Sequence, residues 1–284
     1  MKNNSLKVGD TSHELIHDDA LEAIKEIDSD TIDLAFADPP YNIGKKFASD
    51  KGKEKRNGEY IDWCKEWIAQ IKRVLKPNGS FYLMAATQYM PYLDIYCRDH
   101  FTILNRIVWF YDSSGRQAKT KFGSRYEPIL LSVMDENDYT FNYEDITVTA
   151  KTGAERELID YRKDPPEPYN TEKNPGNVWE FPRVRYRMPE YIDDHPSQKP
   201  ELLLERIVLA SSNPGDVVLD PFSGTFTTSA VCGKLRRNSI SIEIEEEYIE
   251  KGRERLESVN PGDEICNKHN HDEKTKSASL EDFS

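Results

Sequence analysis

Short apolar runs alternate with amphipathic segments along most of this chain, and this alternation restricts the possible folds more than any other feature. Apolar runs predict buried strands at 14–17, 31–37, 80–85, 107–110, 129–133, 217–219 and 239–244. Apolar residues at helical spacing predict helices at 20–27, 61–75, 90–98, 201–211, 225–234 and 246–256. This order indicates a mostly parallel, doubly wound α/β sheet, in which ligands bind beyond the carboxyl ends of the strands.

The composition, 37% hydrophobic and 31% charged, is typical of a globular enzyme. No apolar run approaches the roughly 20 residues that span a bilayer. Residues 1–10 lack the apolar core of a secretory signal, so we expect a cytoplasmic protein without a membrane partner. The four cysteines show no CxxC pairing and are expected as free thiols: Cys64, Cys97, Cys232 and Cys266.

No metal site is predicted. The best candidate ligands are Cys266, His269 and His271, which lie in a polar acidic segment with no suitably spaced fourth ligand. A solvated tail explains these residues better than a zinc site.

Net charge at first argues against a nucleic-acid partner, because phosphate contacts require Lys and Arg. The formal charge is -13, but residues 240–284 hold 13 acidic and six basic residues, a net of -7. Residues 45–56 hold six basic and two acidic residues, a net of +4. Because the local field matters more than the total, charge alone does not decide the question.

The tetrapeptide Asp38-Pro39-Pro40-Tyr41 follows the apolar run 32–37 directly. A strand would therefore carry it to the ligand-binding edge of the sheet. Two prolines stiffen the corner and remove two N–H donors, which leaves a carboxylate and free carbonyls beside an aromatic ring. Such a corner suits an exocyclic amine, whose two hydrogens need acceptors while its ring stacks on tyrosine.

A second, similar stretch provides an internal comparison. Asp164-Pro165-Pro166 is followed by Glu167-Pro168-Tyr169, but the polar residues 161–163 precede it in place of a buried strand. We interpret this second copy as a surface loop and the first as a chemical site.

The run Val217–Leu219 leads into Asp220-Pro221-Phe222-Ser223-Gly224-Thr225 and then into a predicted helix. A glycine in such a turn allows close approach of a ligand to the backbone, and a helix N-terminus favours a carboxylate. Glu243 ends the next strand roughly 20 residues later, the spacing at which an acid accepts hydrogen bonds from ribose hydroxyls. Together these features predict a cofactor that contains adenosine.

These motifs, with His195-Pro196-Ser197-Gln198-Lys199-Pro200, resemble the DNA amino-methyltransferases of the β class, in which the catalytic tetrapeptide precedes the cofactor turn. The resemblance extends to about Leu256. At finer grain the chain resembles the YhdJ-type orphan adenine methyltransferases of enterobacteria, on the stretches YDSSG, YEPIL, LIDYRK and PGNVWEFPRVRY. The resemblance implies S-adenosylmethionine as cofactor, N6 of adenine in double-stranded DNA as acceptor, and an ATGCAT-like palindrome as target.

The resemblance also implies roles for individual residues. The catalytic set is Asp38, Pro39, Pro40 and Tyr41. The cofactor set is Asp19, Ala20, Asp38, Lys199, Asp220, Phe222, Ser223, Gly224, Thr225 and Glu243, with Lys199 at the methionine end and Asp19 with Ala20 beside the cofactor adenine. The family turn often has two glycines or an alanine, whereas Ser223 and Thr225 flank a single glycine here; because both are small, we expect binding to persist.

Basic residues outside the two motifs are candidates for DNA contact, either to guanine or to phosphate. They are Lys45, Lys46, Arg116, Lys119, Lys121, Arg125, Arg183, Arg185 and Arg187. An edge strand with solvated arginines is the alternative for 183–187, and an idle loop is the alternative for 45–56.

The sequence therefore predicts one methyltransferase domain with an insertion. Its parts are a catalytic half at 11–110, a target-recognition insertion at 111–194, a cofactor-binding half at 195–258 and a disordered acidic tail at 259–284. N4-cytosine methylation is the nearest alternative function, although Asp in the first motif position favours adenine in this family. Methylation of RNA or of a protein glutamine, and a DNA-binding regulator that has lost catalysis, are further alternatives. A homodimer is left open.

Overall fold

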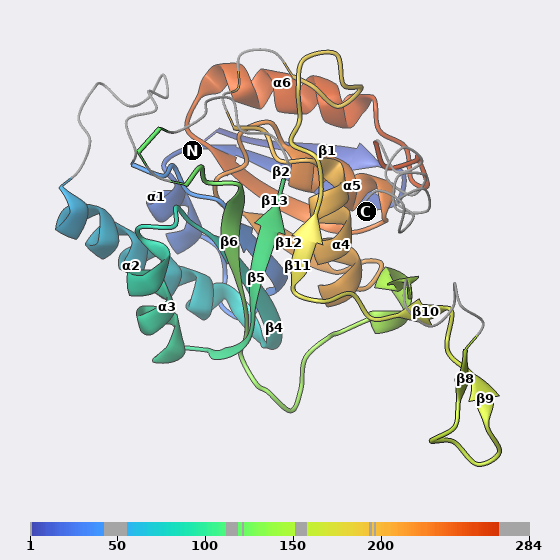
Figure 1. Ribbon diagram of the computed structural model, residues 1–284. Coiled ribbons are helices and arrows are strands. Elements are labelled where there is room, and N and C mark those ends of the chain that lie inside the picture. The colour runs from blue at the N-terminus through green and yellow to red at the C-terminus, as the bar shows by residue number, and fades with distance from the viewer. Residues whose placement is uncertain are drawn as a thin grey trace.

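The computed structural model describes residues 2–42, 56–111, 119–120, 122–150, 158–192, 195 and 197–266. Within this part, one nine-stranded sheet forms the centre of the molecule (Figure 1), in the order β1-β2-β13-β12-β3-β4-β6-β5-β11. The strands are β1 Lys2–Val8, β2 Thr11–His17, β3 Ile32–Ala37, β4 Leu75–Met84, β5 Thr102–Phe110, β6 Tyr126–Val133, β11 Val178–Glu180, β12 Val217–Asp220 and β13 Asn238–Glu243.

Parallel pairing extends from β2 through β13, β12 and β3 to β4. β6 is antiparallel to both of its neighbours, β4 and β5, and β1 is antiparallel to β2. β6 is therefore the reversed strand inside the sheet, and its first residues lie at the edge where the parallel strands end. The prediction of a mostly parallel, doubly wound sheet is confirmed.

Helices cover both faces of the sheet because the central strands are apolar on both sides. In β4, Phe81 and Leu83 pack into the cluster beneath α1 Ala20–Lys25, α2 Asn57–Val74 and α3 Met90–Arg98. Tyr82 and Met84 pack into the opposite cluster, which includes α4 Glu201–Ser211 and α5 Thr227–Lys234. α6 Glu246–Glu257 packs with α5 against β1 and β2.

All six predicted helices are present, although α2 begins at Asn57 rather than at Ile61. α5 begins at Thr227 rather than at Thr225. The preceding turn is longer than predicted because Gly224 and Phe226 take φ values of +49° and 57°, which an α-helix does not allow.

The predicted insertion contains only short strands in its described part: β7 Val148–Thr149, β8 Ile159–Asp160, β9 Glu167–Pro168 and β10 Glu172–Lys173, besides β11. β8 and β9 form a hairpin that extends away from the helices (Figure 1). The second Asp-Pro-Pro copy lies in this hairpin and is exposed, as predicted for a surface loop. β11 joins the central sheet as its edge strand beside β5.

The prediction of disorder from residue 259 onward is wrong for 259–266. Val259 and Ile265 are buried, and the N–H of Gly262 donates to the carbonyl of Lys234 at 2.8 Å. Two apolar side chains among acidic residues are enough to attach this segment to the domain, and they are too few to produce a periodic pattern. Residues 267–284 lie outside the described residues.

No helix in the described ranges is both long and apolar enough to cross a membrane. The four cysteines are free thiols, as expected. The same described ranges contain no group of three His, Cys, Asp or Glu residues that could hold a metal ion.

Candidate active site

The two predicted motifs lie side by side at one edge of the sheet. β3 and β12 are parallel neighbours, with Leu34 opposite Val218 and Ala35 opposite Leu219. Asp38, just past β3, and Asp220, the last residue of β12, therefore emerge together, and the charge of Asp38 acts on the Asp220 carboxyl. The juxtaposition on which a shared donor and acceptor site depends is present.

The Asp38 carboxylate has one engaged and one open oxygen. Its Oδ2 lies 2.5 Å from the Nζ of Lys199. Its Oδ1 is buried and accepts no hydrogen bond from the described residues. An unsatisfied buried carboxylate oxygen is costly unless a ligand donor reaches it, so Oδ1 is the acceptor that this corner offers.

Tyr41 is fixed by its hydroxyl as well as by packing. The hydroxyl donates to Oε2 of Glu127 at 2.7 Å. Tyr111, which follows β5, donates to Oε1 of the same carboxylate at 3.4 Å. The Lys199 ammonium lies 5.4 Å from the centre of the Tyr41 ring and 3.6 Å from Oε2 of Glu127. Of the predicted corner, Pro39 is buried and Pro40 is exposed.

Burial and neighbouring charges set the protonation of this corner. Burial raises the pKa of Asp38 above its ordinary value, although Lys199 opposes the shift. Burial alone would lower the pKa of Lys199, but Asp38 and Glu127 raise it above its ordinary value. Burial and the same two carboxylates also raise the pKa of Tyr41, which therefore remains a hydrogen-bond donor.

The cofactor turn is held by its own side chains. Oδ1 of Asp220 accepts from the N–H of Phe222 at 3.0 Å, and its Oδ2 accepts from the hydroxyl of Thr228. Burial raises the pKa of Asp220 to about 7. Ser223 donates from its hydroxyl to the carbonyl of Asp220 at 2.8 Å, and the hydroxyl of Thr225 lies 3.2 Å from that of Thr227. The small polar residues that differ from the family turn thus bond within the turn itself.

Gly224 is required at its position for two reasons. Its φ of +49° lies in the left-handed region, which side chains disfavour. A Cβ at this position would lie 2.8 Å from Nε2 of His195. The His195 ring stacks edge-on against Tyr248 at 4.9 Å, so the first residue of the HPSQKP segment lies directly on the turn.

Glu243 ends β13 beside this turn. Its Oε2 accepts from the N–H of Gly224 at 2.8 Å, and its Oε1 accepts from the N–H groups of Ile244 and Glu245, both at 2.9 Å. Burial raises its pKa, and these N–H groups oppose the shift.

Asp19 and Ala20 lie at the end of the neighbouring strand β2. The N–H of Asp18 donates to the carbonyl of Glu243 at 3.2 Å, which places this loop beside Glu243. Asp19 caps α1 by accepting from the N–H of Leu21 at 2.9 Å, and Ala20 is buried. The structure thus brings the predicted cofactor residues to one edge of the sheet, where Lys199 pairs with Asp38.

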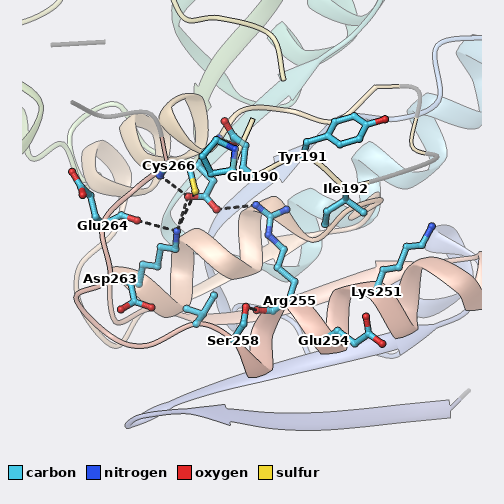
Figure 2. Close-up of a pocket in the computed structure, with 14 residues that line it drawn as sticks. Glu190, Tyr191, Ile192, Lys251, Glu254, Arg255, Ser258, Asp263, Glu264 and Cys266 are labelled. Atoms are coloured by element: carbon cyan, nitrogen blue, oxygen red, sulfur yellow. Dashed lines mark hydrogen bonds and ion pairs between the residues drawn. The ribbon is translucent and has the colours of Figure 1, made fainter. Parts of the chain in front are cut away.

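A buried ion cluster that includes Arg255 (Figure 2) lies next to the turn. Glu201 forms ion pairs with Arg255 at 2.8 Å and with Lys234 at 2.7 Å. Arg255 also donates to the carbonyl of Thr225 at 2.9 Å. The N–H of Cys266 donates to Glu201 at 2.9 Å, which links the segment 259–266 to the same cluster.

The predicted DNA contacts divide into two groups. Lys45, Lys46, Arg116 and Lys121 lie outside the described residues. Lys119, Arg125, Arg185 and Arg187 are exposed, and Arg183 is partly buried. The guanidinium of Arg183 lies 5.0 Å from the centre of the Tyr111 ring, next to the catalytic corner.

Residues 183–187 do not form the edge strand that was the alternative interpretation of their arginines. The edge strand is β11, which ends at Glu180, and an irregular segment with a turn follows it.

Sequence reasoning missed Glu127 and Tyr111. The signal was present in the apolar strand that starts at YEPIL, whose glutamate precedes the buried residues. The direction of that strand could not be predicted from its composition.

The fold and the site agree with the comparisons to known proteins. The DNA methylase family that groups N6 and N4 methylases matches residues 32–254. The chain is 57% identical over 253 residues to the DNA adenine methyltransferase YhdJ of Escherichia coli, covering 88% of this chain and 85% of that protein. It is 37% identical to the type II methyltransferase M.HpaI of Haemophilus parainfluenzae, over 86% and 74% of the two chains.

Solved structures support the same architecture. The cytosine-N4-specific PvuII DNA methyltransferase is similar with a TM-score of 0.67 at 20% identity, covering 89% of this chain and 90% of that one. The M1.HpyAVI complex with S-adenosylmethionine has a TM-score of 0.57 at 24% identity, covering 86% and 99%.

The mostly parallel sheet with helices on both faces is the Rossmann-like fold of the solved DNA methyltransferases. Among proteins of that fold, the chain belongs to the N6/N4 DNA methylase family. The predictions of the fold, of the family and of a DNA methyltransferase are confirmed.

Proposed function

We propose that this DNA methyltransferase transfers the methyl group of S-adenosylmethionine to N6 of an adenine flipped out of duplex DNA. The observation that carries the proposal is the open Oδ1 of Asp38, buried beside Tyr41 and next to the cofactor turn. The named activity of the 57% identical relative, a DNA adenine methyltransferase, supports the same acceptor.

The residues present fit an adenosine-bearing cofactor. Gly224 leaves its backbone accessible where a side chain would contact His195. The Glu243 carboxylate is held rigidly by three backbone N–H groups, and a carboxylate oxygen can accept more than one hydrogen bond, so ribose hydroxyls can still donate to it. Asp19 lies just beyond β2, one strand further along than Glu243, and we assign it to the cofactor adenine.

The chain supplies position and polarisation, which this reaction chiefly requires. S-adenosylmethionine, if held by the turn at Gly224 and by Glu243, would supply an electrophilic methyl group, which would leave sulfur as it bonds to N6. Asp38 accepts one N6 hydrogen at Oδ1, the Pro39 carbonyl accepts the other, and Tyr41 stacks on the flipped base. Asp38 need not be a strong base, because N6 becomes acidic only as it is methylated, and the proton that it then loses can pass to Oδ1 of Asp38.

The target sequence and the DNA contacts are finer parts of the proposal. We assign phosphate or base contact to Lys119, Arg125, Arg183, Arg185 and Arg187, with the four undescribed basic residues as further candidates. An ATGCAT-like palindrome is the proposed site, and a homodimer would match its two-fold symmetry.

Incubation with methyl-labelled cofactor and duplex DNA, followed by nucleoside analysis, tests the activity. We expect label in N6-methyladenine from wild-type protein and none from Asp38→Ala, which should still bind cofactor. Asp164→Ala is the matched control, because it removes the aspartate of the exposed second copy. Label in N4-methylcytosine would establish the alternative acceptor, and DNA binding without label would indicate a regulator. Mapping methylated adenines in plasmid DNA tests the ATGCAT-like site.

A further inference from the structure

Glu127 is a largely buried carboxylate that connects three groups of the catalytic corner. One oxygen accepts from Tyr41 at 2.7 Å and lies 3.6 Å from the Lys199 ammonium. The other accepts from Tyr111 at 3.4 Å. The side chain is only 15% exposed, so solvent screens these contacts weakly.

The reversed direction of β6 explains how this glutamate reaches the site. β6 pairs antiparallel with β4, where Met84 lies opposite Ile129. Glu127 precedes Ile129 and therefore lies beyond the carboxyl end of β4, at the same edge as Asp38 beyond β3. A strand parallel to β4 would place its second residue at the opposite edge.

We propose that Glu127 is a positioning residue for methyl transfer, which rests on the proposed function above. It fixes the plane of the Tyr41 ring through the hydroxyl, so that the ring is set for stacking before the base arrives. It also shares the Lys199 ammonium with Asp38, so that the ammonium stays on Oδ2 and leaves Oδ1 for the N6 hydrogen. The ring and the carboxylate are thus positioned by one side chain.

The electrostatic role of Glu127 has a consequence for pH dependence. Asp38 is faced by Lys199, Glu127 and Tyr41, and its charge also reaches Tyr60 on α2 and Asp220 on β12. Lys199 is faced by the two carboxylates and by Arg183. The negative charge of Glu127 raises the pKa of both Asp38 and Lys199. Removing it should lower both values.

The test uses Glu127→Gln in the full chain, which keeps the size of the side chain and removes its charge. We expect kcat to fall about 10- to 100-fold, the equivalent of one charged hydrogen bond. The KM for DNA and the cofactor Kd should change less than about twofold. Glu136→Gln, an exposed glutamate just after the other end of β6, is the matched control and should match wild type.

Two further measurements separate positioning from a general structural role. Tyr41→Phe removes the hydroxyl that Glu127 binds, so the double variant with Glu127→Gln should be no slower than the slower single variant. The acid limb of the kcat profile, set by Asp38, and the alkaline limb, set by Lys199, should both move to lower pH in Glu127→Gln. If Glu127→Gln does not fold, kcat and KM are measured for Tyr41→Phe and for Tyr111→Phe instead. Tyr111→Phe removes the longer hydrogen bond to Glu127, so its kcat should fall less.

The two proposals fail in different ways. The positioning role is overturned if the wild-type protein methylates adenine and Glu127→Gln has the same kcat and the same acid and alkaline limbs of its pH profile. The proposed function is then unaffected. Multiplicative losses in the double variant overturn the coupling between Glu127 and Tyr41. Absence of N6-methyladenine from the wild-type protein overturns both proposals.

Discussion

The ammonium nitrogen of Lys199 lies 2.5 Å from Oδ2 of Asp38, and both side chains are largely buried. Burial raises the pKa of a carboxylate, and a neighbouring ammonium lowers it. Lys199 therefore opposes the effect of burial on the pKa of Asp38, and it occupies Oδ2 while Oδ1 remains open.

Replacement of Lys199 by Met tests this relationship. The lysine charge lowers the pKa of Asp38, so its loss should raise that pKa further, and the acid limb of the kcat profile should move to higher pH. At neutral pH we expect kcat to fall about 100-fold, because the raised pKa leaves less of the Asp38 carboxylate ionised to accept the N6 hydrogen. Lys163→Met removes an exposed lysine that pairs with Glu167 at 2.7 Å and should leave kcat unchanged. An acid limb at the wild-type pH in Lys199→Met would contradict the assignment.

A second prediction concerns the cofactor turn. Gly224→Ala should weaken cofactor binding about tenfold, because the new side chain meets both a positive φ and the His195 ring. Gly215→Ala is the control: its φ of +90° is equally strained, but nothing lies within 4 Å of the added Cβ. Both variants should lose stability, and only the first should lose affinity in titration calorimetry. Equal affinities would show that the backbone of Gly224 does not face the cofactor.

The parts of the site at the ends of parallel strands could be predicted from the sequence. Asp38 and Asp220 each follow an apolar run, and the rule that such ends share an edge was sufficient to place them together. Glu127 could not be found by that rule, because it starts a strand rather than ending one. Its role depends on the reversal of β6, which is decided by pairing with β4 and β5 rather than by local composition.

Two further features also arise from tertiary packing. Lys199 has a flexible four-carbon side chain that could reach either motif, so its ion pair with Asp38 could not be predicted from the sequence. β1 was not predicted, because its first four residues are polar and give little apolar signal; it is held by antiparallel pairing with β2.

A third prediction concerns stability toward acid. Burial lowers the pKa of His13 to about 4, and its two ring nitrogens contact Thr11 and Ser239 at 2.9 and 2.8 Å. The unfolded chain binds that proton near pH 6.5, so the unfolded state takes up more protons as the pH falls. The contribution of neutral His13 to the free energy of unfolding is therefore fully present above pH 6.5 and is lost as the pH falls to about 4.

Urea unfolding between pH 7 and pH 4.5 measures this contribution. Over that range the free energy of unfolding of His13→Gln should fall by about 2–3 kcal/mol less than that of wild type, because the unfolded variant takes up no proton at this position. His17→Gln, at a half-buried position four residues along the same strand, should follow the wild-type slope. Parallel slopes for wild type and His13→Gln would contradict the prediction.

The last prediction uses the ion cluster behind the cofactor turn. Burial disfavours the charged form of Glu201, but Arg255, the N–H of Cys266 and Lys234 hold its pKa below the ordinary value. Its contribution to stability is therefore present above the pKa of the unfolded chain and is lost as the pH falls below it.

Glu201→Gln leaves two buried cations without a full counter-charge, so we expect the free energy of unfolding to fall by about 3–5 kcal/mol at pH 7. Glu22→Gln breaks a pair of the same 2.7 Å length with Lys25 on the surface and should change little. Folded Glu201→Gln protein should also bind cofactor more weakly, because Arg255 then loses the carboxylate that aims it at the Thr225 carbonyl. Equal losses in the two variants would mean that the length of an ion pair, rather than its burial, determines its contribution here.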